Sequence, residues 1–133
     1  MPFILHARLE ADTAFIADRA LSRVLLMNDA RYRWLILVPR RADVIELHDL
    51  DAADRATLTE EIAAASRTLK LLAGAAKINI GALGNLVPQL HVHIVARSAG
   101  DPAWPGPVWG HSPAMPYDAA TRDAFIAQFL NAR

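Results

Sequence analysis

The first forty residues alternate between short apolar runs and polar breaks, a pattern typical of strands joined by tight links. Residues 14–18 form a short candidate strand, and residues 22–29 form a stronger one that ends in a turn-forming Asn-Asp pair. A third apolar run, residues 32–41, follows after only a few residues and is interrupted by Pro39. Two apolar runs separated by a short polar link predict an antiparallel hairpin.

The middle of the chain changes to the period of a helix, and residues 51–77 predict one long helix. Asp51 fits the N-cap, and Asp54 lies in the first turn, where a carboxylate interacts favourably with the helix dipole. Gly74 fits the position just past the C-cap. Apolar residues recur at steps of three and four along one stripe, formed by Leu58, Ile62, Ala65, Leu69 and Leu72.

Strand patterns return after this helix. Residues 77–83 and 87–97 are separated by a short Gly84-Asn85 link and predict a second hairpin. A last helix, residues 117–133, places Phe125, Ile126, Phe129 and Leu130 on one face. The elements together predict an α+β domain, with about five antiparallel strands and one long helix packed on one face of the sheet. The other face must then be covered by the C-terminal segments, by a partner or by a ligand.

Composition limits the class of protein. A chain of 133 residues, 53% apolar and 21% charged, suits one soluble domain spanning residues 1–133. Its formal net charge of zero argues against a nucleic-acid polymer as partner. The absence of cysteine fits a reducing compartment. No signal peptide is visible, and no apolar run approaches the ~18 residues of a membrane span, so we expect a cytoplasmic protein.

Three polar side chains occupy alternate positions in the apolar stretch "GNLVPQLHVHIVAR". If this stretch is a strand, Gln89, His91 and His93 share one face, while the apolar residues between them pack on the other face. Imidazoles this close to one another cannot all be charged without mutual repulsion. A neutral imidazole is a good base and nucleophile near neutral pH.

These residues alone leave three interpretations open. The two histidines are surface residues without a role, or they chelate a metal ion with a third ligand from His6, His48 or His111. In the third interpretation, His91 is a nucleophile in nucleotidyl transfer. Nothing in the sequence places a third ligand beside the pair, and no acidic residue lies on the strand, so we expect neither a metal nor another cofactor.

The stretch and its neighbours resemble the histidine-triad (HIT) superfamily of nucleotide hydrolases and transferases. That family carries His-φ-His-φ-His-φ-φ, where φ is apolar, and the matching string here is "QLHVHIV", with Gln89 in place of the first histidine. "VLLMNDARYRWLILVPRR" is similar to the family's earlier hairpin, and "INIGALGNLVPQLHVHIVAR" to the hairpin that carries the motif within residues 77–97. The Pro- and Trp-rich tail, residues 100–117, resembles the segment that follows it.

The resemblance implies roles for particular residues. His91 matches the histidine that attacks the α-phosphate, and His93 the one that contacts phosphate or the leaving-group oxygen. A backbone carbonyl near the first motif position fixes the tautomer of the nucleophile in the family, so Gln89 is compatible with attack. The implied nucleotide contacts lie near the two hairpins: Asn79, Gly84 and Asn85 at the phosphate, Asp29 at the ribose hydroxyls, and Asn28 and Met27 near base and sugar.

The resemblance therefore implies a homodimeric enzyme that needs no metal and acts at the α-phosphate of a nucleoside phosphate conjugate through a covalent nucleotidyl-histidine. Dinucleoside polyphosphates and nucleoside phosphoramidates are the implied substrate classes. The alternative is a nucleotide-binding module with little or no catalysis, marked by Gln89, which cannot titrate. We expect Trp34, Trp104 and Trp109 to be core or dimer contacts, and Arg97 to lie near phosphate or at the surface.

Overall fold

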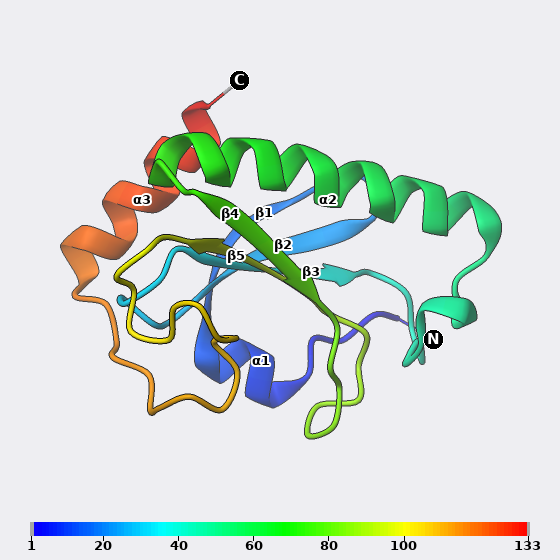
Figure 1. The fold of residues 1–133 in the computed structure, drawn as a ribbon. Helices are drawn as coiled ribbons and strands as arrows, with labels where there is room; N and C mark the ends of the chain where they lie inside the picture. The colour runs from blue at the N-terminus through cyan, green and yellow to red at the C-terminus, as the bar shows by residue number, and fades with distance from the viewer. Residues whose placement is uncertain (1, 133) are drawn as a thin grey trace.

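The computed structural model describes residues 2–132 and contains one five-stranded antiparallel sheet in the order β1-β2-β3-β5-β4. Helices α2 and α3 lie on one side of this sheet, while α1 and the long tail before α3 lie on the other (Figure 1). The predicted α+β architecture is confirmed. The elements in chain order are α1 Ala7–Asp12, β1 Thr13–Asp18, β2 Ser22–Met27, β3 Trp34–Pro39, a 3₁₀ turn Leu47–Asp49, α2 Ala52–Ala73, β4 Lys77–Gly81, β5 Val92–Arg97 and α3 Ala119–Asn131.

The helix-covered face contains a regular apolar core. Side chains alternate along each strand, so one set from β2, β3 and β5 meets the apolar stripe of α2. Asp51 caps α2 by accepting a 2.7 Å hydrogen bond from the backbone N of Asp54, and Gly74 ends the helix in the left-handed region at φ 60°. The buried side chains of this core include Leu26, Leu35, Leu37, Leu69, Ile94, Phe125 and Phe129.

The two ends of α3 differ from the prediction. The helix begins at Ala119 instead of residue 117, because Asp118 caps it by accepting a hydrogen bond from the backbone N of Thr121. It ends at Asn131, while Arg133, the last residue of the predicted helix, lies outside the described residues. Phe125 and Phe129 face the core as predicted.

The predicted strand 87–97 is too long, because β5 begins only at Val92. Pro88 has no N–H to give to a ladder, and the backbone N of Leu90 donates to the carbonyl of Val44, far from β4. The connection between β4 and β5 is therefore residues 82–91 rather than a short Gly84-Asn85 link. The hairpin itself is confirmed, since β4 pairs with β5 in antiparallel register.

The opposite face of the sheet is covered by segments whose sequences show no helical or strand period. Residues 2–12, including the unpredicted helix α1, pack there together with the tail from residue 98 to residue 117. This outcome matches one of the expected covers, the C-terminal segments. The buried side chains of this second cluster are Leu9, Leu25, Tyr32, Trp34, Ile36, Val38, Val87, Val95, Ala103 and Val108.

A buried ion pair fixes the start of this tail. Arg97, only 1% exposed, donates through Nε and Nη2 to the carboxylate of Asp101 at 2.8 and 3.0 Å, and through Nη1 to Asn79 Oδ1 at 2.9 Å. The surface position expected for Arg97 is therefore wrong, because the side chain is buried in this ion pair. None of the described helices is both long and apolar enough to cross a membrane.

Candidate active site

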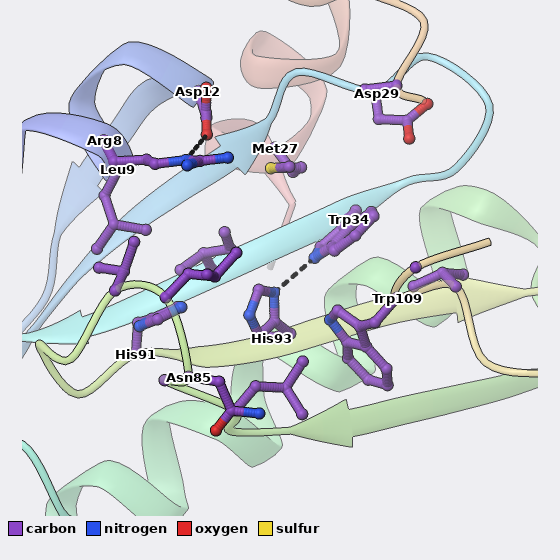
Figure 2. A pocket seen from close by; sticks show the side chains of 18 of the residues that line it. Arg8, Leu9, Asp12, Met27, Asp29, Trp34, Asn85, His91, His93 and Trp109 are labelled. Atoms are coloured by element: carbon purple, nitrogen blue, oxygen red, sulfur yellow. Dashed lines mark hydrogen bonds and ion pairs between the residues drawn. The ribbon is translucent and has the colours of Figure 1, made fainter. Parts of the chain in front are cut away.

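A cavity of about 630 Å³ opens on the tail-covered face of the sheet, above the start of β5. Its wall is assembled from α1, the end of β2, the middle of β3, the 82–91 connection and the tail. Figure 2 shows the two histidines close together at its floor, with Trp34 and Trp109 beside His93. The cavity has the size of a small-molecule site.

His91 is held in one tautomer by the backbone. Its Nδ1 lies 2.7 Å from the carbonyl oxygen of Gln89, and a carbonyl can only accept, so Nδ1 carries the proton. In the neutral ring Nε2 then has a free lone pair, and no hydrogen bond to Nε2 is found among residues 2–132. The ring is buried at the cavity wall. This is the arrangement that a nucleophilic imidazole requires.

His93 is held in the opposite tautomer. Its Nδ1 accepts a 3.0 Å hydrogen bond from the indole Nε1 of Trp34, so its proton is carried by Nε2. Burial, with a smaller contribution from the neighbouring His91, lowers the pKa of His93 from 6.5 to about 4. The two imidazole centroids lie 4.9 Å apart. His93 is therefore a neutral donor beside a potential nucleophile.

Four of the predicted nucleotide contacts line the same cavity: Met27, Asp29, Gly84 and Asn85. Gly84 has φ 79°, a backbone conformation that favours glycine, and it turns the 82–91 connection over the histidines. Asp29 is buried, and Arg31 donates to both of its carboxylate oxygens, at 2.9 and 2.8 Å. Of the effects on the pKa of Asp29, burial is the largest and raises it, but the hydrogen bonds from Arg31 and from the backbone N of Met115, together with the Arg31 charge, outweigh burial and keep the pKa below its usual value.

Three predicted site residues do not line the cavity. Asn79 is the acceptor for Arg97, and the Asn28 side chain accepts a 2.9 Å hydrogen bond from the backbone N of Tyr117. The Gln89 side chain points away to the N-terminal segment, where Oε1 accepts from the backbone N of His6 at 2.8 Å and Nε2 donates to the carbonyl of Ile4 at 2.9 Å. All three side chains hold neighbouring backbone or side chains in place.

The structure also brings in residues that the sequence did not single out as contacts. Arg8 and Asp12 of α1 form a 3.5 Å ion pair at the cavity rim, visible in Figure 2. Trp34 and Trp109, expected to be core or dimer contacts, line the cavity beside His93. The indole Nε1 of Trp109 is buried without a hydrogen-bond partner among the described residues. No periodic signal marks Arg8, Asp12 or Trp109, because they come from a short helix and a loop, and the strand pattern around Trp34 does not show that its indole lines a cavity.

The metal-site interpretation has no ligand set in the part of the chain that the structure describes. Within residues 2–132, no three His, Cys, Asp or Glu side chains are grouped to hold a metal ion. Of the proposed third ligands, the Nδ1 of His6 accepts from the backbone N of Arg8, and His48 and His111 are exposed and are not among the residues that line the cavity.

Comparison with known proteins agrees with this geometry. Residues 8–100 match the HIT domain family, whose members are nucleotide-binding proteins of hydrolase or transferase type. Among curated proteins, none matches this chain. Solved structures of three histidine triad proteins are similar over nearly their whole length.

The protein from Bradyrhizobium japonicum is 51% identical, with a TM-score of 0.96 over 98% of this chain and 97% of that one. The protein from Sinorhizobium meliloti is 50% identical, with a TM-score of 0.95 over 96% of this chain and 95% of its own. The protein from Marinobacter aquaeolei is 44% identical, with a TM-score of 0.94 over 96% and 93% of the two chains. The chain therefore belongs to the HIT domain family.

Proposed function

We propose that this protein is a nucleotide phosphohydrolase or nucleotidyl transferase that acts at the α-phosphate of a nucleoside phosphate conjugate. The observation that carries the proposal is the 2.7 Å hydrogen bond from His91 Nδ1 to the Gln89 carbonyl, which leaves Nε2 free at the wall of the cavity. Dinucleoside polyphosphates and nucleoside phosphoramidates are the candidate substrate classes. The intermediate is a nucleotidyl group bound to His91 Nε2.

The neighbouring donors suit a phosphoryl group in the transition state, where negative charge spreads over the phosphoryl oxygens. We assign the Nε2–H of His93, the Asn85 amide and the backbone N–H of Gly84 to these oxygens. Asp29 is assigned to the ribose hydroxyls beside Met27. Among the described residues, its Oδ2 accepts a hydrogen bond only from Arg31 Nη2. No such role is assigned to Asn28 or Asn79, since each already serves a structural partner.

Gln89 is the residue that we assign to the first motif position. Its backbone carbonyl orients His91, and its side chain fastens residues 4–6 to the connection before β5. A glutamine supplies both a donor and an acceptor for this contact without any titration. We infer that the substitution keeps the nucleophile oriented while it removes acid–base chemistry from this position.

The test compares wild type with His91→Ala on adenylylated and guanylylated conjugates, with the covalent intermediate trapped by mass spectrometry. Loss of turnover and of the labelled His91 peptide, with an unchanged melting temperature, supports the proposal. His48→Ala is the matched control, because His48 is exposed and outside the cavity wall. Equal turnover by wild type and His91→Ala rejects the mechanism.

The alternative, a nucleotide-binding module with little catalysis, is favoured by one observation. The Gln89 side chain is fully engaged with backbone groups, so it provides no proton transfer. This alternative predicts that purine mononucleotides raise the melting temperature while no conjugate in the panel is cleaved.

We also propose that the protein is a cytoplasmic homodimer, as the family resemblance implies. The edge strand β4 supports this association, because its Ile80 is 53% exposed and the unpaired edge is available for a second sheet. Sedimentation equilibrium tests the dimer, and a monomer at micromolar concentration rejects it.

A further inference from the structure

The hydrogen bond between Trp34 and His93 restricts what His93 can do chemically. An indole N–H only donates, so Trp34 can hydrogen-bond to His93 only while His93 Nδ1 keeps a lone pair. Protonation of Nδ1 would leave two N–H donors facing each other 3.0 Å apart inside the protein, and neither would have the other as an acceptor. The contact is buried on both sides, since Trp34 is 5% and His93 7% exposed.

The groups packed around His93 supply no charge that would favour an imidazolium. Its strand neighbours are Ile36 on β3 and Gly81 on β4, and its aromatic neighbours are Trp34 and Trp109, with ring centroids 5.6 and 5.5 Å away. His91 also lies beside the ring, with its centroid 4.9 Å away, and disfavours a second positive charge. No carboxylate is among these groups.

Gly81 shows that the second indole has a specific place. A Cβ at this position would lie 3.1 Å from the Trp109 ring, closer than ordinary side-chain contacts allow. The missing side chain therefore leaves space for Trp109 against the exposed side of His93. The two indoles pack against the His93 ring and leave little of it exposed, and its pKa of about 4 agrees with this burial.

We propose that His93 acts as a permanently neutral hydrogen-bond donor, held in that state by Trp34, and that it does not protonate the leaving group. The inference rests on the proposed function and deepens it. It makes Trp34 a positioning residue that determines specificity, because the N–H of a neutral imidazole is too weak an acid to protonate a strongly basic leaving group as it departs. The substrates are nucleotidyl anhydrides, in which phosphate, pyrophosphate or a carboxylate departs as a weakly basic anion.

The chemical step balances without an acid. The lone pair of His91 Nε2 forms the N–P bond, while the P–O bond to the leaving group breaks and its electron pair stays on the departing oxygen. The proton stays on His91 Nδ1, hydrogen-bonded to the Gln89 carbonyl, so the intermediate is a nucleotidyl-imidazolium. Water then attacks phosphorus, the N–P electron pair returns to Nε2, and the proton of the water passes to solvent.

Alkylamine and alkoxide leaving groups need a proton as the bond breaks, and a positioned general acid contributes about 10²–10⁴-fold in such reactions. We therefore expect unactivated phosphoramidates and alkyl esters to be cleaved slower than anhydrides by at least about a hundredfold. This expectation separates the two substrate classes left open by the proposed function.

The first experiment measures the tautomer directly and needs no substrate. Nitrogen-15 NMR of the imidazoles in the full chain, titrated from neutral pH to about pH 5, should show His93 neutral with Nε2 protonated throughout. In Trp34→Phe, which keeps an aromatic ring but lacks the N–H, the fixed tautomer should be lost. A wild-type His93 that becomes protonated near its usual pKa of 6.5 would overturn the inference.

The second experiment measures leaving-group dependence with adenosine 5′-phosphate esters of phenols of graded acidity, together with an alkyl phosphoramidate. In wild type, kcat/KM should fall steeply as the leaving group becomes more basic. Trp34→His places at this position a ring that can accept as well as donate, so it should flatten the dependence most, whereas Trp34→Phe, which removes the donor but supplies no acceptor, should flatten it less. A shallow dependence in wild type would contradict the inference even where His91 is the nucleophile.

Failure of the neutral-His93 proposal can be distinguished from failure of the proposed function. If no ester is cleaved by wild type, the proposed function fails, while the NMR titration still decides the state of His93. If either variant is unfolded by circular dichroism, the wild-type titration and the wild-type leaving-group series remain decisive.

Discussion

The two faces of the sheet are covered by different kinds of structure. The face under α2 and α3 is filled by aliphatic and aromatic side chains that recur at the periods of strands and helices. The face under α1 and the tail is closed by irregular chain, fixed through a buried ion pair, side-chain-to-backbone hydrogen bonds and indole contacts. The first face determines the fold, and the second holds the cavity with both histidines.

The same strands contribute to both faces, so the difference lies in what covers them. Along β3, Leu35 and Leu37 face the helices while Trp34 and Ile36 face the cavity, and all four are buried. Irregular chain can place polar groups at chosen points, which a close-packed helix does not allow. The comparison predicts that substitutions on the two faces affect different properties.

The largest expected contrast is between His91→Ala and Leu69→Ala. We expect His91→Ala to lower kcat/KM by at least about a thousandfold, because the nucleophile is lost, with little change in the free energy of unfolding. Leu69→Ala should lower the free energy of unfolding by about 2–5 kcal/mol through cavity formation in the core, with activity per folded molecule preserved.

Urea unfolding and initial rates on the same preparations check this contrast. If Leu69→Ala reduced activity per folded molecule as much as it reduced stability, the separation between the faces would be wrong.

This division also explains which features the sequence could predict. The stripe of α2, its Asp51 cap and the β2–β3 hairpin follow from periodicity and local chemistry, and all are found. The pairing of Arg97 with Asp101 and the turn of Gln89 toward Ile4 depend on which distant segments meet, which no local pattern encodes. Even the strand start at Val92 was missed, because alternation continues through Gln89 and His91 although the ladder does not.

Asp101→Ala tests whether charge, rather than apolar packing, holds the tail-covered face. Removal of the carboxylate leaves the Arg97 guanidinium buried with Asn79 as its remaining hydrogen-bond partner, which should lower the free energy of unfolding by about 3 kcal/mol or more. Calorimetry or urea unfolding measures the change. The matched control is Asp123→Ala, whose exposed pair with Arg122 should contribute less than about 1 kcal/mol; equal losses for the two variants would refute the idea.

Acidification should destabilise the cavity side through His93. The unfolded chain binds a proton at this histidine below about pH 6.5, while the folded protein does so only near pH 4, so the unfolded state binds more protons between these values. The free energy of unfolding should therefore decrease as the pH is lowered through that window, by up to about 3 kcal/mol from this group.

The measurement is urea unfolding at several pH values for wild type, His93→Asn and His48→Asn. His93→Asn should lose this part of the slope, while His48→Asn, which changes an exposed histidine, should keep it. Parallel slopes for wild type and His93→Asn would contradict the assignment of a neutral buried His93.

The smallest effect concerns the contact between Gln89 and the N-terminal segment. Gln89→Ala removes two hydrogen bonds to backbone groups of Ile4 and His6, and should lower the free energy of unfolding by about 1–2 kcal/mol. Because that segment leads into α1, amide exchange should increase in residues 4–12 and not in α2. Gln89→Glu is the sharper variant, since its carboxylate still accepts from His6 but cannot donate to Ile4.

Turnover in Gln89→Ala then separates the two roles of this residue. The backbone carbonyl that orients His91 remains, so kcat should change little, while KM should rise as α1 and its Arg8 become mobile at the cavity rim. A large loss of kcat with unchanged exchange in residues 4–12 would mean that the Gln89 side chain itself takes part in the chemistry. In that case the division between a structural Gln89 and a chemical His91 would have to be abandoned.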